Sequence, residues 1–113
     1  MSGAALSSEQ AYEEAADRAL RALERGIGEI QGELEADLGG GILTIEFERG
    51  GKYVINSHRA ARQIWMAAES SAWHFDHRPA DDRWISSKSG EELWDAVEAV
   101  LSRKLGRTVT LPR

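Results

Sequence analysis

The chain has 113 residues, which is the size of a single domain built around one hydrophobic core. It contains no cysteine, and this excludes disulfides, thiolate nucleophiles and cysteine-ligated metal sites. No apolar stretch is long enough to span a membrane, and residues 1–10 contain no Lys or Arg, so neither a membrane helix nor a leader peptide is expected. We therefore expect one cytoplasmic domain covering 1–113, with residues 1–7 flexible.

The net charge of −5 argues against a nucleic-acid partner, because such binding depends on clustered Lys and Arg. The charge is unevenly distributed. Residues 1–48 hold 11 Asp or Glu and 3 Arg, whereas residues 49–113 hold 8 acids and 11 bases. The acidic first half indicates a cation or a basic protein surface as partner, and the competing interpretation is ordinary solubilising charge.

A first helix is predicted from residue 8 to about residue 30, where apolar side chains recur every three or four positions. Acidic residues line one flank of this helix: Glu13, Asp17 and Glu24. Basic residues gather on the face opposite the apolar stripe: Arg18, Arg21 and Arg25. The plainer alternative is that these charges form ordinary ion pairs along the helix, Glu14 with Arg18 and Asp17 with Arg21.

Strands are predicted after Gly32, where acidic and apolar residues alternate strictly. This alternation directs three carboxylates to one face: Glu33, Glu35 and Asp37. Further alternating or aromatic stretches predict strands at 43–48, 52–56, 63–68, 72–77 and 83–86, separated by turn residues. The simplest pairing of such consecutive strands is an antiparallel meander.

A second helix is predicted after Ser89, because Ser89 and Glu92 fit a capping box and an apolar stripe continues to Leu105, where Gly106 can end the helix. Helices at both ends of an antiparallel run describe an α+β domain. We expect a two-layer sandwich with both helices on one face of a sheet of about five to six strands, and with the other face partly wet.

The acidic residues of the first helix and first strand are the strongest candidate site, because hard cations such as iron, calcium or magnesium prefer oxygen ligands. The candidate ligands are Glu13, Asp17, Glu24, Glu29, Glu33, Glu35 and Asp37. Strand residues on one face lie about 6.6 to 7 Å apart at the backbone, too far for a tight cage. We expect weak, exposed binding of several ions, and the alternative is a plain solvated face.

A second candidate is a partner surface on the uncovered sheet face. If Ile64 and Met66 point into the core, then Gln63 and Trp65 point outward, and Asn56 joins them. The alternative is a tryptophan shielded by neighbouring loops.

His74 and Asp76 share a strand face and could share a metal, although a histidine satisfied by a nearby carboxylate is the commoner arrangement. No nucleophilic triad or phosphate-binding loop is present, so no catalytic residue is predicted.

Several of these stretches together resemble the frataxin family, in particular its bacterial CyaY form. The stretches are 40–48 (GGILTIEFE), 53–56 (YVIN), 63–67 (QIWMA), 74–76 (HFD), 84–85 (WI), 89–91 (SGE) and 93–95 (LWD). The resemblance covers residues 33–111 and, less closely, the first helix. Family members often carry a dense acidic cluster at the end of that helix, where this chain has Gly26, Ile27, Gly28 and Ile30.

The resemblance implies an iron-binding protein of iron–sulfur cluster assembly. In such a protein an acidic ridge binds ferrous and ferric iron weakly and contacts a cysteine desulfurase, while the open sheet face contacts the assembly machinery, including the scaffold protein. It assigns Glu33, Glu35 and Asp37 to the ridge and Asn56, Gln63 and Trp65 to the sheet face. It also implies a monomer that iron can assemble into oligomers. The alternatives are an iron-oxidising or iron-storing ferroxidase and a docking domain that does not depend on metal.

Overall fold

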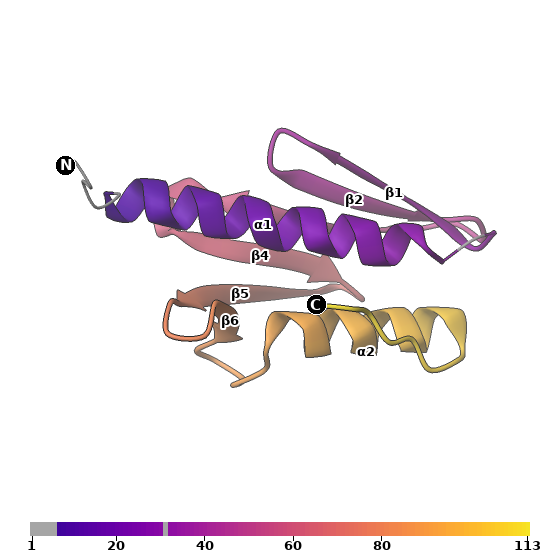
Figure 1. The fold of residues 1–113 in the computed structure, drawn as a ribbon. Helices are drawn as coiled ribbons and strands as arrows, with labels where there is room; N and C mark the ends of the chain where they lie inside the picture. The colour runs from indigo at the N-terminus through magenta and orange to yellow at the C-terminus, as the bar shows by residue number, and fades with distance from the viewer. Residues whose placement is uncertain (1–6, 31) are drawn as a thin grey trace.

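Two helices flank six strands in the computed structural model, which describes residues 7–30 and 32–113 (Figure 1). In chain order the elements are α1 (Ser8–Gly28), β1 (Leu34–Gly39), β2 (Ile42–Phe47), β3 (Lys52–His58), the short 3₁₀ turn η1 (Arg59–Ala61), β4 (Gln63–Ala68), β5 (Ser71–Arg78), β6 (Arg83–Ser86) and α2 (Leu93–Leu105). No helix in the described part of the chain is both long and apolar enough to cross a membrane.

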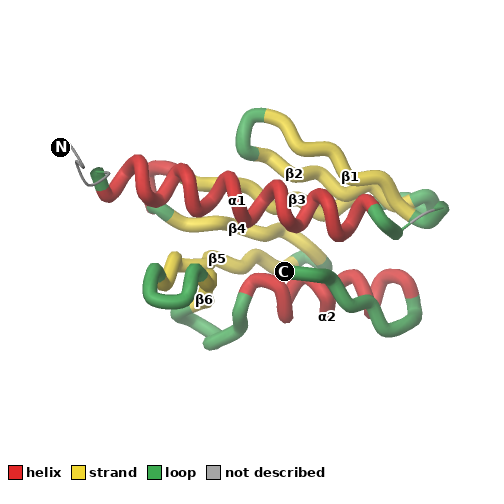
Figure 2. Tube along the Cα trace, viewed as in Figure 1, coloured by secondary structure: helices red, strands yellow, loops and turns green. Residues whose placement is uncertain are grey.

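The sheet is a continuous antiparallel meander with strand order β1-β2-β3-β4-β5-β6. Each strand pairs with its neighbours in the sequence, as the alternating pattern predicted. Both helices lie on the same face of the sheet, and the other face, called here the open face, carries no helix (Figure 2). The predicted two-layer α+β sandwich is therefore confirmed.

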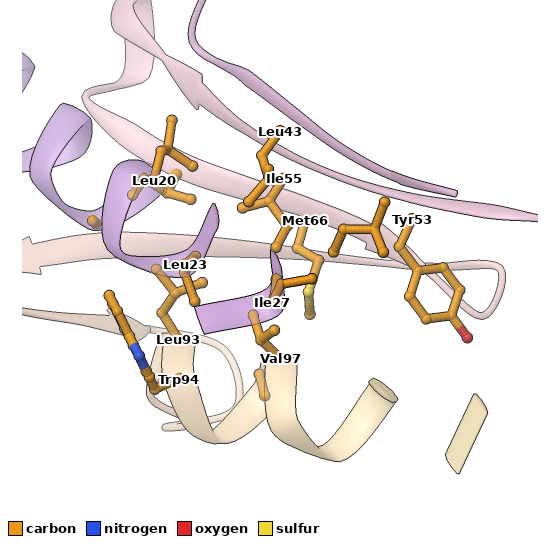
Figure 3. Close-up of a cluster of buried hydrophobic side chains, with 14 of the residues drawn as sticks. Leu20, Leu23, Ile27, Leu43, Tyr53, Ile55, Met66, Leu93, Trp94 and Val97 are labelled. Atoms are coloured by element: carbon orange, nitrogen blue, oxygen red, sulfur yellow. The ribbon is translucent and has the colours of Figure 1, made fainter. Parts of the chain in front are cut away.

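The core lies between the two helices and the covered face of the sheet, where apolar residues of both layers meet (Figure 3). Its most deeply buried side chains, at most 2% exposed, include Leu20, Leu23 and Ile27 of α1, Leu43, Ile55 and Met66 of the sheet, and Leu93 and Val97 of α2. Burying one such side chain contributes about 1.5 to 3 kcal/mol, so this interface fixes how α1 sits on the sheet.

The ends of α1 are set by local hydrogen bonds. Ser7 is the N-cap, and its side chain and that of Gln10 form a reciprocal capping box. The helix ends at Gly28, two residues before the predicted end, and Glu29 is the C-cap. The flexibility expected for the remaining residues 1–6 falls outside the described part of the chain.

The start of α2 differs from its prediction. The helix begins at Leu93, and Glu92 is its N-cap, with a side chain that accepts a hydrogen bond from the Asp95 amide. The Ser89 hydroxyl instead accepts from the Glu91 amide, and Gly90 has a φ of 78°, which interrupts helical geometry before residue 93. The predicted capping box is therefore wrong, whereas Gly106 does end the helix in a left-handed conformation.

The C-terminal segment, residues 108–113, lies between the two helices (Figure 1). Its Pro112 carbonyl accepts a hydrogen bond from the Trp94 indole, and its Leu111 amide donates to Glu98, so it is held by α2. Pro112 also lies directly over Gly26 of α1, where an added Cβ would be 3.2 Å from the proline ring. The segment thus joins the two helices.

Candidate metal-binding ridge and partner surface

Three of the predicted metal ligands lie together along one flank of α1. Glu13, Asp17 and Glu24 line a groove of about 480 Å³ between α1 and the β1–β2 turn, called here the helix groove. The helical spacing places their side chains on this flank, and the glycines at 39–41, which have no side chains, line the opposite wall. The groove therefore presents carboxylate oxygens to solvent.

Two of these three carboxylates already have cationic partners. Arg59 donates to Glu13 at 2.8 Å, and Arg21 donates to Asp17 at 2.8 Å, as predicted for the latter pair. Glu24 has no ion-pair partner among the described residues. All four paired side chains are at least 40% exposed, and such ion pairs contribute only about 0.2 to 1 kcal/mol, so a multivalent cation can compete with them.

The acidic residues of β1 point to the open face, away from α1. Glu35 and Asp37 alternate with Leu34 and the partly buried Ala36, and both carboxylates are exposed. Glu33 precedes the strand and forms an ion pair with Arg107. Glu29 caps the end of α1 and is exposed.

The structure therefore divides the seven predicted ligands between two sides of the edge strand β1. Together they form the acidic ridge: Glu13, Asp17, Glu24, Glu29, Glu33, Glu35 and Asp37. Within the described residues, no three acidic or histidine side chains are close enough to form a metal cage. The ridge is thus a set of separated carboxylates, a geometry in which each ion would have few protein ligands.

Two further carboxylates near the ridge did not emerge from the sequence. Glu46 is directly opposite Glu35 in the β1–β2 pairing, and Glu35, Glu46 and Glu48 line one shallow depression. The alternation predicted both as strand residues, but β2 ends at Phe47, so only Glu46 lies in the strand and Glu48 follows it. Only the pairing register shows that Glu46 faces Glu35, where like charges repel at close range.

The predicted partner surface contains an aromatic stack. The Trp65 indole lies between two imidazole rings, with centroids 3.8 Å from His58 and 4.2 Å from His74 and with interplanar angles of 9° and 15°. Trp65 is half-buried, and the imidazoles of His58 and His74, which come from the two neighbouring strands, stack on its ring. The sequence missed His58 because its place beside Trp65 depends on the β3–β4 register.

Hydrogen bonds fix the polar residues around the stack. The Trp65 indole donates to the Gln63 side chain at 2.8 Å, and the Gln63 amide donates to Asp76 at 2.9 Å. His74 and Asp76 thus have separate partners, and the described residues show no metal cluster that joins them. The amide of Gln63 is held in one orientation, which makes the surface preformed.

Asn56 connects the stack to an exposed apolar residue. In the strand pairing, Asn56 lies between Trp65 of β4 and Ile42 of β2. Ile42 is 48% exposed, and it is the only large hydrophobic side chain classed as exposed among the described residues. The row Ile42, Asn56, Trp65 and His74 crosses four adjacent strands, and aromatic and apolar groups of this kind are enriched at the centres of interfaces.

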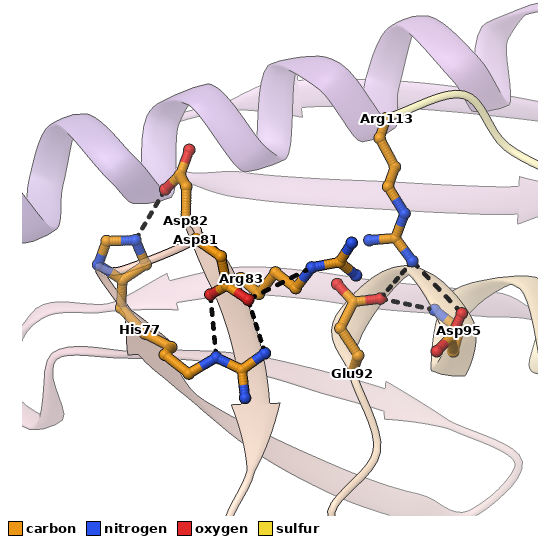
Figure 4. A network of polar contacts seen from close by, with 8 residues as sticks. His77, Asp81, Asp82, Arg83, Glu92, Asp95 and Arg113 are labelled. Atoms are coloured by element: carbon orange, nitrogen blue, oxygen red, sulfur yellow. Dashed lines mark hydrogen bonds and ion pairs between the residues drawn. The ribbon is translucent and has the colours of Figure 1, made fainter.

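The end of the β5–β6 hairpin, which comprises Arg78 of β5 and loop residues 79–82, is attached to the helix layer through Arg18. Figure 4 shows the contacts of this region with His77 and Arg83. Arg18 donates to both carboxylate oxygens of Asp82, at 3.3 and 3.1 Å, and therefore does not form the predicted pair with Glu14. His77 is 2.7 Å from the same carboxylate. Partial burial would raise the pKa of Asp82, but the hydrogen bonds from Arg18 and His77 outweigh it and lower the pKa.

Comparison with known families identifies the fold. The model of the frataxin-like domain, Frataxin_Cyay, matches residues 5–107. The chain belongs to the frataxin family. The matched residues include the whole acidic ridge together with Asn56, Gln63 and Trp65.

Solved frataxin structures have the same fold. A frataxin from Psychromonas ingrahamii, studied as a model of stability within the CyaY family, is 26% identical, with a TM-score of 0.84 over 95% of this chain and 100% of that chain. Yeast frataxin is 25% identical, with a TM-score of 0.69 over 94% of each chain. Trimeric frataxin from Saccharomyces cerevisiae, in a complex with ferrous iron, is 24% identical, with a TM-score of 0.66 over 95% of this chain and 94% of that chain.

Proposed function

We propose that this frataxin-family chain binds ferrous and ferric iron weakly on the acidic ridge and acts in iron–sulfur cluster assembly by modulating a cysteine desulfurase and its scaffold protein. The observation that carries the proposal is the row of separated, solvent-facing carboxylates on both sides of β1 in a frataxin fold. The ferrous complex of a yeast relative supports iron as the cation.

The geometry favours weak and exchangeable binding. Carboxylate oxygens are suitable ligands for iron, but separated carboxylates supply only one or two protein ligands to each ion, so water completes the coordination. Such an ion gains electrostatic stabilisation from the acidic surface without the rigid ligand set of a storage or redox centre. A protein that must release iron or respond to its concentration requires this kind of site.

Iron binding can be located by titrating ferrous iron anaerobically into isotope-labelled protein and following backbone amide signals. We expect selective broadening between Glu13 and Asp37, and a weaker effect in Glu24→Gln, which removes one unpaired carboxylate of the helix groove. Glu14→Gln is the matched control, because Glu14 is on the same helix but outside the groove. Broadening centred on His74 and Asp76, or an equal effect of both variants, would contradict the ridge as the iron site.

Desulfurase binding tests the second part of the proposal. Glu35→Lys combined with Asp37→Lys should weaken the complex at least about tenfold at matched ionic strength, because a basic partner surface would meet reversed charge. Both side chains are exposed, so the fold should be retained. Glu9→Lys combined with Glu14→Lys makes the same change in net charge on α1 and should have a much smaller effect. Unchanged affinity in the β1 variant would reject the ridge as the contact surface.

A metal-independent docking domain is the second candidate, and the preformed stack of His58, Trp65 and His74 favours it. In that case Trp65→Ala should abolish partner binding while neutralisation of the ridge has no effect.

A ferroxidase would show catalytic oxygen consumption by the pure protein with added ferrous iron. Stoichiometric iron binding without turnover would exclude ferroxidase activity.

A further inference from the structure

A second cleft lies along the other flank of α1, between that helix, β6 and the start of α2. It has a volume of about 420 Å³, within the range typical of small-molecule sites. Ala19, Ala22, Trp84 and Trp94 supply its apolar surface. Asp17 is the one residue of the acidic ridge that lines this cleft, so the cleft is separate from most of the ridge.

Arginine side chains from three parts of the chain converge on this cleft, called here the arginine cleft. They are Arg18, Arg21 and Arg25 of α1, Arg83 of β6 and the C-terminal residue Arg113. Four carboxylates also line it, so the guanidinium groups are in excess even though the whole chain has a net charge of −5. The excess positive charge marks the cleft as a place where an anion would be favoured.

Several guanidinium donors in the cleft remain available. Arg25 and Arg83 donate no hydrogen bond to any described side chain. The nearest carboxylate to Arg83 is Asp81 at 3.6 Å, and both oxygens of Asp81 are already bound by Arg78 (Figure 4). Guanidinium groups match the geometry of phosphate oxygens and are the usual residues for recognising them.

Glu92 adds an acceptor to the cleft. Its side chain is only 8% exposed, and its Oε1 accepts from the Asp95 amide at 3.2 Å and from Arg113 at 2.8 Å. Its Oε2 is buried without a hydrogen-bond partner among the described residues (Figure 4). An ionised carboxylate can only accept hydrogen bonds, so a ligand that satisfies Oε2 must supply a donor.

We propose that the arginine cleft binds a phosphate group that carries one proton, either as orthophosphate or as a phosphate monoester. Arg25, Arg83 and Arg113 donate to the unprotonated oxygens, and the P–OH group donates to Oε2 of Glu92. Sulfate has a similar size and charge but no proton to donate, so Glu92 repels it. Phosphate binding in this cleft does not depend on iron binding by the ridge, so the two proposals are tested independently.

The tryptophans provide a direct test of location. The full chain is labelled with ¹⁵N and titrated at about pH 6, near the second pKa of a phosphate monoester. Orthophosphate, AMP and sulfate are compared at matched ionic strength. We expect saturable shifts of the indole signals of Trp84 and Trp94 with phosphate and AMP, no shift of Trp65 on the open face, and at least tenfold weaker binding of sulfate. Tighter binding of AMP identifies an organic phosphate as the better ligand, and equal binding identifies free phosphate.

Three variants distinguish this site from nonspecific anion binding. Arg25→Gln combined with Arg83→Gln should weaken phosphate binding at least tenfold, whereas Arg49→Gln, in the β2–β3 turn, should leave it unchanged. Glu92→Gln preserves a capping oxygen but supplies an amide donor, so sulfate should then bind about as tightly as phosphate. Equal binding of sulfate by the unmodified chain, equal loss in the Arg49 variant, or no saturable shift at the two cleft indoles would overturn the proposal.

Discussion

Glu92, the N-cap of α2, places a carboxylate in the protein interior. Burial alone would raise the pKa of Glu92, but hydrogen bonds from Arg113 and from the backbone amides of Trp94 and Asp95 outweigh burial and lower the pKa. A carboxyl group with a lowered pKa in the folded state stabilises the fold fully above its ordinary pKa of 4.5. This stabilisation is lost as the pH falls through the lowered value.

Arg113→Gln should reduce the free energy of unfolding at neutral pH by about 1 to 2 kcal/mol, because it leaves Glu92 charged and buried with fewer donors. The estimate allows for the 42% exposure of Arg113, which screens the pair. Urea unfolding between about pH 3 and pH 7 measures the effect. The variant should lose less stability than the unmodified chain as the pH falls, and an identical pH dependence would show that Arg113 does not set the pKa of Glu92.

The β1–β2 turn shows how an element depends on its glycines. Gly40 and Gly41 both have positive φ, at 60° and 77°, but only Gly41 lies against another element. A Cβ added at Gly41 would be 2.5 Å from the Ser57 hydroxyl of β3, whereas nothing lies within 4 Å of the corresponding position at Gly40.

Gly40→Ala should destabilise the chain by about 1 kcal/mol through backbone strain alone. Gly41→Ala should cost measurably more, because Ser57 must also move and its amide hydrogen bond to the Gly41 carbonyl, 2.9 Å long, would be disturbed. Thermal unfolding of the two variants makes the comparison. Equal melting temperatures would indicate that β1, β2 and Ser57 accommodate the added methyl group at no further cost in stability.

The elements that were predicted correctly have patterns that are local in the sequence. The strands Gln63–Ala68 and Arg83–Ser86 have the predicted bounds because alternation and turn residues define them. Features that depend on register or on distant partners were not predictable. His58 reaches Trp65 only through the pairing of β3 with β4, and Arg18 finds Asp82 across 64 residues. For the same reason the sequence predicted the ridge residues but not their division between two faces.

At the scale of the whole molecule, the C-terminal segment acts as a clamp on the helix layer. Val109 and Leu111 are 5% and 4% exposed and belong to the core, although they lie in no helix or strand. The Val109 amide donates to the Ser102 hydroxyl at 2.8 Å, and Leu111 is similarly fixed to Glu98. The segment therefore completes a core that two helices alone would leave open.

Leu111→Ala should lower the free energy of unfolding by about 2 to 4 kcal/mol, because it removes a buried side chain and leaves a cavity between the helices. Thr110→Ala, in the same segment but exposed, should change it by less than about 0.5 kcal/mol. Chemical denaturation gives both values. Similar values for the two variants would show that the segment packs loosely against α1 and α2.

The position of β1 at the end of the sheet gives the ridge a consequence for solubility. No strand described here pairs with the outer side of β1, whereas the opposite edge strand, β6, is partly covered by the bridge between Ile85 and Glu92. An uncovered edge can recruit a strand from another copy of the chain, and charged side chains are a common protection against such aggregation. Glu35 and Asp37 place two exposed negative charges on this edge strand, where they would repel a second copy of the chain. Replacing both with neutral, β-branched side chains would turn a protected edge into a template for self-association.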